Sequence, residues 1–95
     1  MTATTTSTSW FVYLLRCSDD SLYAGITTDI QRRLHEHNNT KLGAKYTRAR
    51  RPVTLAFIES STDKSAASKR EYQLRKLTKI AKESLVSTYL QANKQ

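Results

Sequence analysis

Two tyrosines and an arginine–histidine pair are spaced so that a small fold could gather groups able to hold a proton or an anion. Tyr13 and Tyr23 lie in apolar segments typical of neighbouring strands. Side chains alternate between the two faces along a strand, and residues directly paired across two strands point to the same face. The two rings therefore share a face only if the residue numbers of each pair add up to an even number. That register requires an odd-length loop or a bulge. Arg33 and His37 are four residues apart, which makes them neighbours on one side of a helix. The alternatives are that the tyrosines only pack and that the helical pair is an exposed polar flank.

A carboxylate with a possible metal-binding role is Glu71. It follows Ala67 by four residues and precedes Leu74 by three, so it projects near the buried stripe of an expected helix. Carboxylates are rarely buried without a partner or a metal. The sequence leaves two interpretations open, a metal ligand or an ion pair with Arg75 or Lys69.

Strand formers and turn residues predict a β-hairpin followed by a third strand. Residues 10–15 are apolar on both faces, and residues 22–26 form a second short strand. The segment 18–21, Ser-Asp-Asp-Ser, is typical of a turn. The third strand spans residues 53–58, directly after Pro52.

The first helix is expected to begin at Thr28, with Gln31 three residues later as in a capping box. Residues 40–52 have no clear period and are expected to form a basic loop. Asp63 or Ser65 starts a second helix, and Thr78 caps a third. The order β-β-α-β-α-α predicts an α+β domain with a three-stranded antiparallel sheet flanked by helices.

The charge of the chain points to nucleic acid as its partner. Sixteen lysines and arginines stand against eight acidic residues, which gives a net charge of +8. Residues 31–56 contain seven of the basic residues and a single acidic residue, Glu36. A solvated surface is the alternative, but this clustering favours a surface that contacts phosphates.

Several classes of protein are excluded by the composition. The longest apolar run, residues 10–15, is far shorter than a membrane span needs, and no basic amphipathic helix with a large aromatic face indicates membrane binding. Cys17 is the only cysteine, which excludes an internal disulfide and a Cys-cluster zinc site and favours a cytoplasmic location. Gly25 and Gly43 are the only glycines, so we expect no nucleotide cofactor. Residues 1–9 are expected to be a disordered Thr/Ser-rich tail and residues 91–95 a C-terminal tail.

Taken together, the motifs resemble those of the GIY-YIG nuclease family. Its two signature tripeptides correspond to Phe11-Val12-Tyr13 and Tyr23-Ala24-Gly25, and residues 27–34 are similar to the helix that carries the family's arginine, here Arg33. The family's histidine maps to His37 and its metal-binding glutamate to Glu71. Residues 45–53 and 77–79 resemble the small, stand-alone YhbQ-like branch. The resemblance covers roughly residues 10–90, which are expected to form a single GIY-YIG domain.

The resemblance implies phosphodiester hydrolysis with one divalent ion, Mg²⁺ or Mn²⁺. Glu71 would be the protein ligand, because Mg²⁺ keeps much of its water shell and tolerates few protein ligands. Arg33 would clamp a non-bridging phosphate oxygen with its planar fork.

The tyrosines would activate the attacking water. Tyr23 is the first choice and Tyr13 the second, with His37 relaying or accepting a proton and Tyr46 lining the site. A free phenol is a weak base at neutral pH, so a nearby cation or metal must favour its ionised form. Gly25 would let the backbone approach a neighbouring chain or a phosphate closely.

The expected function is endonuclease cleavage with low sequence specificity in DNA repair or processing. DNA is favoured and RNA is possible, and a protein partner could supply targeting. The alternative is a non-catalytic basic module that keeps the fold and binds nucleic acid. It is favoured slightly by the tripeptides, of which the first keeps only its tyrosine and the second has Ala24 for isoleucine, whereas the retained polar positions argue against it. The residues expected to contact the backbone are Arg32, Lys41, Lys45, Arg48, Arg50, Arg51, Lys69, Arg70, Arg75, Lys76 and Lys79.

Overall fold

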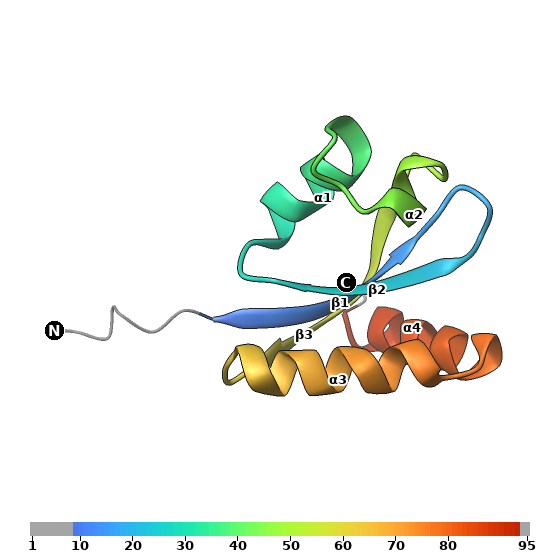
Figure 1. Ribbon diagram of the computed structural model, residues 1–95. Helices are drawn as coiled ribbons and strands as arrows, with labels where there is room; N and C mark the ends of the chain where they lie inside the picture. The colour runs from blue at the N-terminus through green and yellow to red at the C-terminus, as the bar shows by residue number, and fades with distance from the viewer. Residues whose placement is uncertain (1–8, 94–95) are drawn as a thin grey trace, which may run out of the picture.

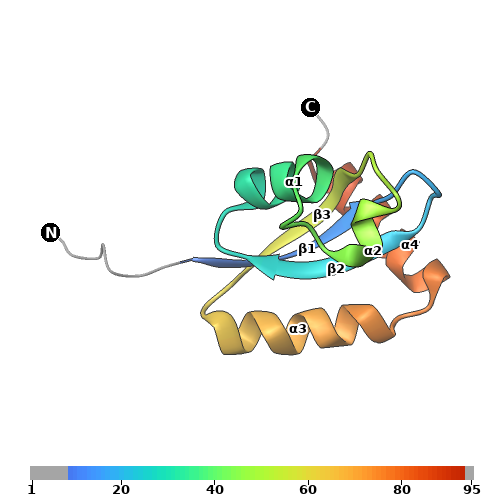
Figure 2. The same cartoon turned by 45° about the horizontal axis from the view of Figure 1, so that its top comes forward.

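The structure, a computed structural model, describes residues 9–93 and consists of one sheet with helices on both faces (Figure 1). The elements in chain order are β1 (Trp10–Arg16), β2 (Leu22–Thr27), α1 (Ile30–Asn39), α2 (Lys45–Arg48), β3 (Thr54–Ser61), α3 (Lys64–Lys76) and α4 (Lys79–Ala92). Helices α1 and α2 lie over one face, and α3 and α4 lie over the other (Figures 1 and 2). The predicted α+β class and the three-stranded antiparallel sheet are confirmed. Of the expected tails, residues 1–8 and 94–95 lie outside the described residues.

The hairpin of β1 and β2 brings the two signature tyrosines to the same face. The strand order is β2-β1-β3, and both outer strands run antiparallel to β1. Tyr13 pairs with Gly25, and Leu15 pairs with Tyr23, so the paired positions have an even sum. An odd-length turn of five residues makes this register possible, closed by a 2.9 Å bond from the Cys17 amide to the Ser21 carbonyl.

Alternation along β1 divides the interior into two clusters. Val12 and Leu14 of β1 pack with residues of α3 and α4 in a fully apolar core. Its buried members are Val12, Leu14, Leu22, Ala24, Ala56, Phe57, Ala67, Leu74 and Val86. On the other face, Tyr13, Leu15, Cys17 and Val53 form a smaller cluster under α1. The buried cluster on the face that holds the tyrosines is therefore smaller and more polar than the cluster on the opposite face.

Helix α1 begins one residue later than predicted. Asp29, not Thr28, is the N-cap, and its carboxylate accepts a 3.0 Å bond from the Arg32 amide. The reason is a local turn in which the Thr27 hydroxyl accepts a 3.1 Å bond from the Asp29 amide and donates to the Asp29 carbonyl. This turn holds Asp29 in the extended conformation that an N-cap requires. The predicted capping box between Thr28 and Gln31 is therefore wrong.

The basic segment 40–52, expected to be a loop, contains the short helix α2. Its four residues are too few to produce a hydrophobic period, which explains why the pattern gave no signal. The other predicted elements are present with shifted ends. In particular, β3 spans Thr54–Ser61 rather than residues 53–58.

Helices α3 and α4 begin where side chains cap them. Of the two predicted starting residues, Asp63 and Ser65, it is Asp63 that caps α3, and its carboxylate accepts a 2.8 Å hydrogen bond from the Ala66 amide. Thr78 accepts a 3.1 Å bond from the Ala81 amide, as predicted. Within residues 9–93, no helix is long and apolar enough to cross a membrane.

An ion pair between Arg16 and Glu83 connects the end of β1 to α4. The Arg16 guanidinium donates to both carboxylate oxygens of Glu83, at 2.7 Å to Oε1, and Lys79 lies 2.8 Å from Oε2. The two cations hold the pKa of Glu83 at about 2, far below its usual value, chiefly through the hydrogen bond from Arg16.

Two side chains tie the C-terminal end of α1 to the segment before β3. The Asn38 amide accepts from the Val53 backbone amide at 2.7 Å and donates to the Val53 carbonyl at 2.9 Å. Arg51 donates to the carbonyls of His37, at 2.6 Å, and of Thr40. These carbonyls lie at the C-terminal end of α1, where a cation is favourable.

We expect Asn38→Ala to lower the free energy of unfolding by about 2 kcal/mol, because it leaves a buried backbone amide and carbonyl without partners. Val53 is only 2% exposed, so water does not readily replace the lost bonds. Urea unfolding followed by circular dichroism measures the change.

Asn39→Ala is the matched control. Asn39 is exposed and its amide bonds only within α1, to His35. We expect a change below about 0.5 kcal/mol for this surface position. Equal effects of the two substitutions would contradict the structural role of Asn38.

Candidate active site

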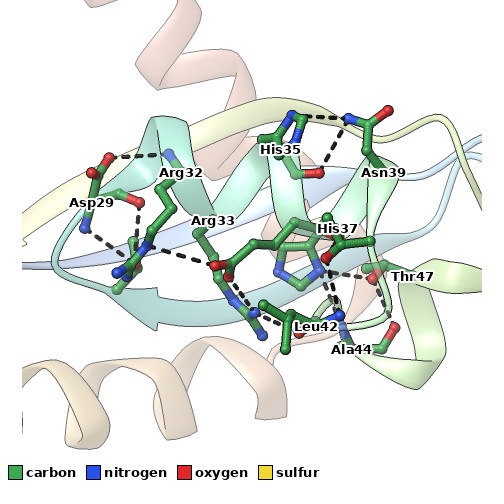
Figure 3. Close-up of polar contacts among 12 residues, drawn as sticks. Asp29, Arg32, Arg33, His35, His37, Asn39, Leu42, Ala44 and Thr47 are labelled. Carbon is green, nitrogen blue, oxygen red and sulfur yellow. Dashed lines mark hydrogen bonds and ion pairs between the residues drawn. The ribbon is translucent and has the colours of Figure 1, made fainter.

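A buried chain of hydrogen bonds connects β1, α1 and α2. The Tyr13 hydroxyl lies 2.9 Å from Nε2 of His37, and Nδ1 of the same ring lies 2.7 Å from the Thr47 hydroxyl. Tyr13 is 1% exposed, and the other two residues are fully buried. In Figure 3, dashed lines join one nitrogen of the His37 ring to Thr47 and to the backbone of Ala44. Two of the predicted catalytic residues, Tyr13 and His37, are thus in direct contact.

Gly25 makes room for the Tyr13 phenol. A Cβ atom on Gly25 would lie 2.4 Å from the Tyr13 hydroxyl oxygen and 2.5 Å from Cζ of its ring. The sequence predicted a close approach at Gly25 to a neighbouring chain or a phosphate, and the group that fills the space is this ring. Glycine is therefore the residue type that lets the phenol cross β2 and reach His37.

Burial sets the protonation states of the pair. It raises the pKa of Tyr13 to about 12, although the nearby Arg33 guanidinium acts in the opposite direction. It also lowers the pKa of His37 to about 4, assisted by the positive charge of Arg33. At neutral pH the site therefore holds a neutral phenol and a neutral imidazole.

Arg33 lies beside this pair and at the surface. Its Nη1 atom donates to Glu36 Oε1 at 3.0 Å and to the Leu42 carbonyl at 2.8 Å (Figure 3). Its side chain is 25% exposed. The guanidinium is thus held by one carboxylate and one carbonyl while part of it faces solvent.

A cleft of about 440 Å³ opens next to Arg33. Its lining combines apolar, hydroxyl and charged side chains: Trp10, Ile26, Thr27, Thr28, Arg32, Arg33, Glu36 and Leu42. The volume falls within the usual range for ligand sites, and two guanidinium groups suit an anion there.

Tyr23 and Tyr46 form the outer wall of the site. Tyr23 packs edge-on against the His37 ring at 5.5 Å and stacks on Tyr46 at 5.7 Å. Tyr46 is 39% exposed, and the Arg50 guanidinium lies 3.8 Å from its ring centre. Burial raises the pKa of Tyr23, with Arg33 opposing and Glu71 adding to the rise.

Glu71 lies on α3, which packs against β1 and β2. Its side chain is 19% exposed and pairs with Nε of Arg75 at 3.0 Å, so the ion pair that the sequence left open is present. Within residues 9–93, no three His, Cys, Asp or Glu side chains come together as a metal cluster. One mostly buried carboxylate suits a hard ion such as Mg²⁺, which keeps most of its water, and does not suit zinc.

The predicted phosphate-contacting residues divide into two groups. Some are already engaged within the fold: Arg51 with α1 carbonyls, Arg50 with Asp19, Arg70 with Glu59, Arg75 with Glu71, Lys79 with Glu83, and Arg32 with Glu36. The others are exposed and form no ion pair within residues 9–93: Lys41, Lys45, Arg48, Lys69 and Lys76. Arg51 is the most firmly held of the first group, because its guanidinium donates to the carbonyls of both His37 and Thr40.

Thr47 is the site residue that sequence reasoning missed. A threonine within a basic segment carries no signal of its own, and its partner His37 is ten residues away. The nearest indication was the resemblance of residues 45–53 to one branch of a family.

Comparison with known proteins identifies the class to which this fold and site belong. Residues 9–84 match the GIY-YIG catalytic domain, which is most of the chain. The chain belongs to the GIY-YIG family, a nuclease superfamily whose members generally use divalent metal ions.

Within that family the chain belongs to the YhbQ-like branch. It is 53% identical over 78 residues to the UPF0213 protein DP2720 of Desulfotalea psychrophila, covering 82% of this chain and 71% of that protein. It is 48% identical over 80 residues to the UPF0213 protein YhbQ of Escherichia coli, covering 84% and 79%.

Solved structures of relatives share the fold. The solution NMR structure of the protein EF2693 from E. faecalis is 44% identical, covers 85% of each chain and superposes with a TM-score of 0.58. That of the UPF0213 protein BH0048 from Bacillus halodurans is 41% identical, covers 84% of each chain and gives a TM-score of 0.54.

We expect Gly25→Ala to displace the Tyr13 ring and to destabilise the protein by about 1–3 kcal/mol, the usual cost of overpacking. The same substitution in a Tyr13→Ala background should cost much less, because the clashing ring is gone. A double-mutant cycle measured by urea unfolding tests this coupling. Additive effects would show that the two positions do not meet.

We expect His37 to make stability fall as the pH drops from about 6.5 to about 4. Its folded pKa lies below its unfolded pKa, so the unfolded state binds more protons in this window, and stability is retained above it. The shift corresponds to a loss of about 3 kcal/mol at most. Unfolding midpoints measured between pH 4 and pH 7 detect it.

His35 provides the control for this pH dependence. It is exposed on the same helix, so His35→Gln should leave the dependence in place, whereas His37→Gln should reduce it. A titration midpoint for His37 near 6.5 in NMR spectra would refute the prediction.

Proposed function

We propose that this protein is a metal-dependent endonuclease that hydrolyses phosphodiester bonds in nucleic acid, with DNA as the favoured substrate. The observation that carries the proposal is the 2.9 Å contact between the Tyr13 hydroxyl and His37 Nε2, beside the Arg33 guanidinium. In this proposal the Tyr13 hydroxyl would receive a proton from the attacking water and pass its own proton to His37.

In this proposal Tyr13, rather than Tyr23, receives the proton of the attacking water. A phenol can accept a proton only if it passes its own proton on, and His37 Nε2 is an acceptor within reach. Tyr23 contacts the same imidazole through its ring, in an edge-on arrangement. Its role would be to shape the site together with Tyr46.

Arg33 and Glu71 would act on the phosphate. The Arg33 guanidinium would bind a non-bridging oxygen and counter the charge that builds up in the transition state. Glu71 would hold one Mg²⁺ or Mn²⁺, which when bound supplies Lewis-acid stabilisation of the leaving oxygen. Arg75, which forms an ion pair with the Glu71 carboxylate, would then have to release that carboxylate to the metal ion.

The exposed cations would hold the nucleic acid through its backbone. Such contacts carry no direct sequence information, which supports low sequence specificity. A role in DNA repair or processing, with a protein partner that supplies targeting, is consistent with this small domain. The single cysteine, buried and free, suits a reducing compartment such as the cytoplasm.

A non-catalytic nucleic-acid-binding module is the second candidate. The observation that favours it is the state of Arg33, whose guanidinium already bonds to Glu36 and to the Leu42 carbonyl. A module of this kind would bind nucleic acid through the same cations without needing a metal.

Cleavage of labelled DNA with and without Mg²⁺ or Mn²⁺ tests the proposal. We expect metal-dependent cutting that falls at least about 100-fold in Glu71→Gln, because the ion stabilises transition-state charge by several kcal/mol. Arg33→Lys should lose about 100-fold, because lysine does not reproduce the planar fork.

Glu59→Gln is the matched control for Glu71→Gln. Glu59 lies on β3, at the opposite edge of the sheet from β2, and forms an ion pair with Arg70. Its loss should leave cleavage unchanged. Tight, salt-sensitive binding without cutting in any of these proteins would favour the binding module instead.

A further inference from the structure

Thr47 is a fully buried polar residue in contact with the candidate catalytic histidine. Its hydroxyl oxygen lies 2.7 Å from His37 Nδ1 and 2.9 Å from the Ala44 carbonyl oxygen, to which it donates (Figure 3). Both partners are fixed, because His37 belongs to α1 and Ala44 is the residue that precedes α2.

The number of protons on each group decides the direction of these bonds. A threonine hydroxyl has one proton, and donating it to the Ala44 carbonyl leaves only lone pairs to face His37. The imidazole must then donate from Nδ1–H. Its Nε2 atom consequently carries a lone pair and accepts the 2.9 Å bond from the Tyr13 hydroxyl.

The opposite arrangement fits the distances less well. If Thr47 donated to Nδ1, the 2.9 Å bond to the Ala44 carbonyl would be lost. The compensation would be the Ala44 backbone amide, which lies 3.4 Å from Nδ1 and is at best a weak donor at that length. The Nδ1–H tautomer therefore makes two short bonds, of 2.7 Å and 2.9 Å, whereas the alternative makes one short bond of 2.7 Å and one long bond of 3.4 Å.

We propose that Thr47 is a positioning residue that holds His37 in the Nδ1–H tautomer, so that Nε2 faces the Tyr13 phenol as a proton acceptor. Its catalytic meaning rests on the proposed nuclease activity. When the attacking water adds to phosphorus, its proton would pass to the Tyr13 oxygen while the phenol proton passes to Nε2. The imidazolium that results would still donate from Nδ1 to Thr47.

Nitrogen-15 NMR of the His37 ring tests the proposal in the protein without substrate. We expect the wild type to show a protonated Nδ1 and an unprotonated Nε2 at neutral pH. Thr47→Val has nearly the same shape without the hydroxyl, and it leaves the neighbouring charges of Arg33, Glu36 and Arg51 in place. In this variant the Nδ1–H signature should decline, and Thr47→Ser should restore it.

His35, which is exposed, provides an internal reference whose ring signals should not change among these proteins. Thermal unfolding of each variant checks that it is folded. A wild-type ring protonated on Nε2 would overturn the proposal even if Thr47→Val failed to fold. An unchanged tautomer in folded Thr47→Val would overturn it as well.

Cleavage rates separate this inference from the proposed function. We expect Thr47→Val to lose about 10- to 100-fold in single-turnover rate, within the range of a misaligned general base, and Thr47→Ser to regain most of it. A Thr47→Val rate equal to wild type would remove the catalytic part of the proposal. A wild type that has the expected tautomer but cuts no nucleic acid would refute the nuclease function and leave the role of Thr47 in holding the tautomer supported.

Discussion

The hydrogen bond between the Tyr13 phenol and the His37 ring is the contact on which the arrangement of this face depends. It crosses from the central strand β1 to helix α1, and both partners are buried. An unpaired phenol or imidazole there would be costly, so the fold must hold the two groups in register. Thr47 fixes the far side of the ring, and Arg51 binds the carbonyl of the same histidine.

Local rules predicted the parts of the site that depend on periodicity. The alternation of strand residues indicated how the two tyrosines share a face, and helical spacing made Arg33 and His37 neighbours. The contact of Thr47 was beyond such rules, because it depends on how the loop after α1 folds back. At Gly43 in that loop, a Cβ atom would come within 2.7 Å of the Glu36 carbonyl and of His37 Cα. Such a close approach is tertiary and has no period in the sequence.

The count of sixteen lysines and arginines overstates the positive charge that the surface offers to a ligand. Several arginines are neutralised by carboxylates that come from distant segments, such as Glu59 for Arg70 and Glu83 for Arg16. These pairs connect elements of the sheet and helices. The freely exposed cations lie instead around α2 and along α3, so the field that a nucleic acid meets is directional rather than uniform.

The crossing of the Tyr13 ring over Gly25 links two positions that are twelve residues apart. An aromatic ring at position 13 leaves no volume for even a methyl group at position 25. Evolution of this hairpin therefore has few single steps available at position 25. In chains that share the fold, the two positions should co-vary, with glycine at the second wherever an aromatic ring occupies the first, and a larger residue at the second should persist only after the ring at the first has been lost.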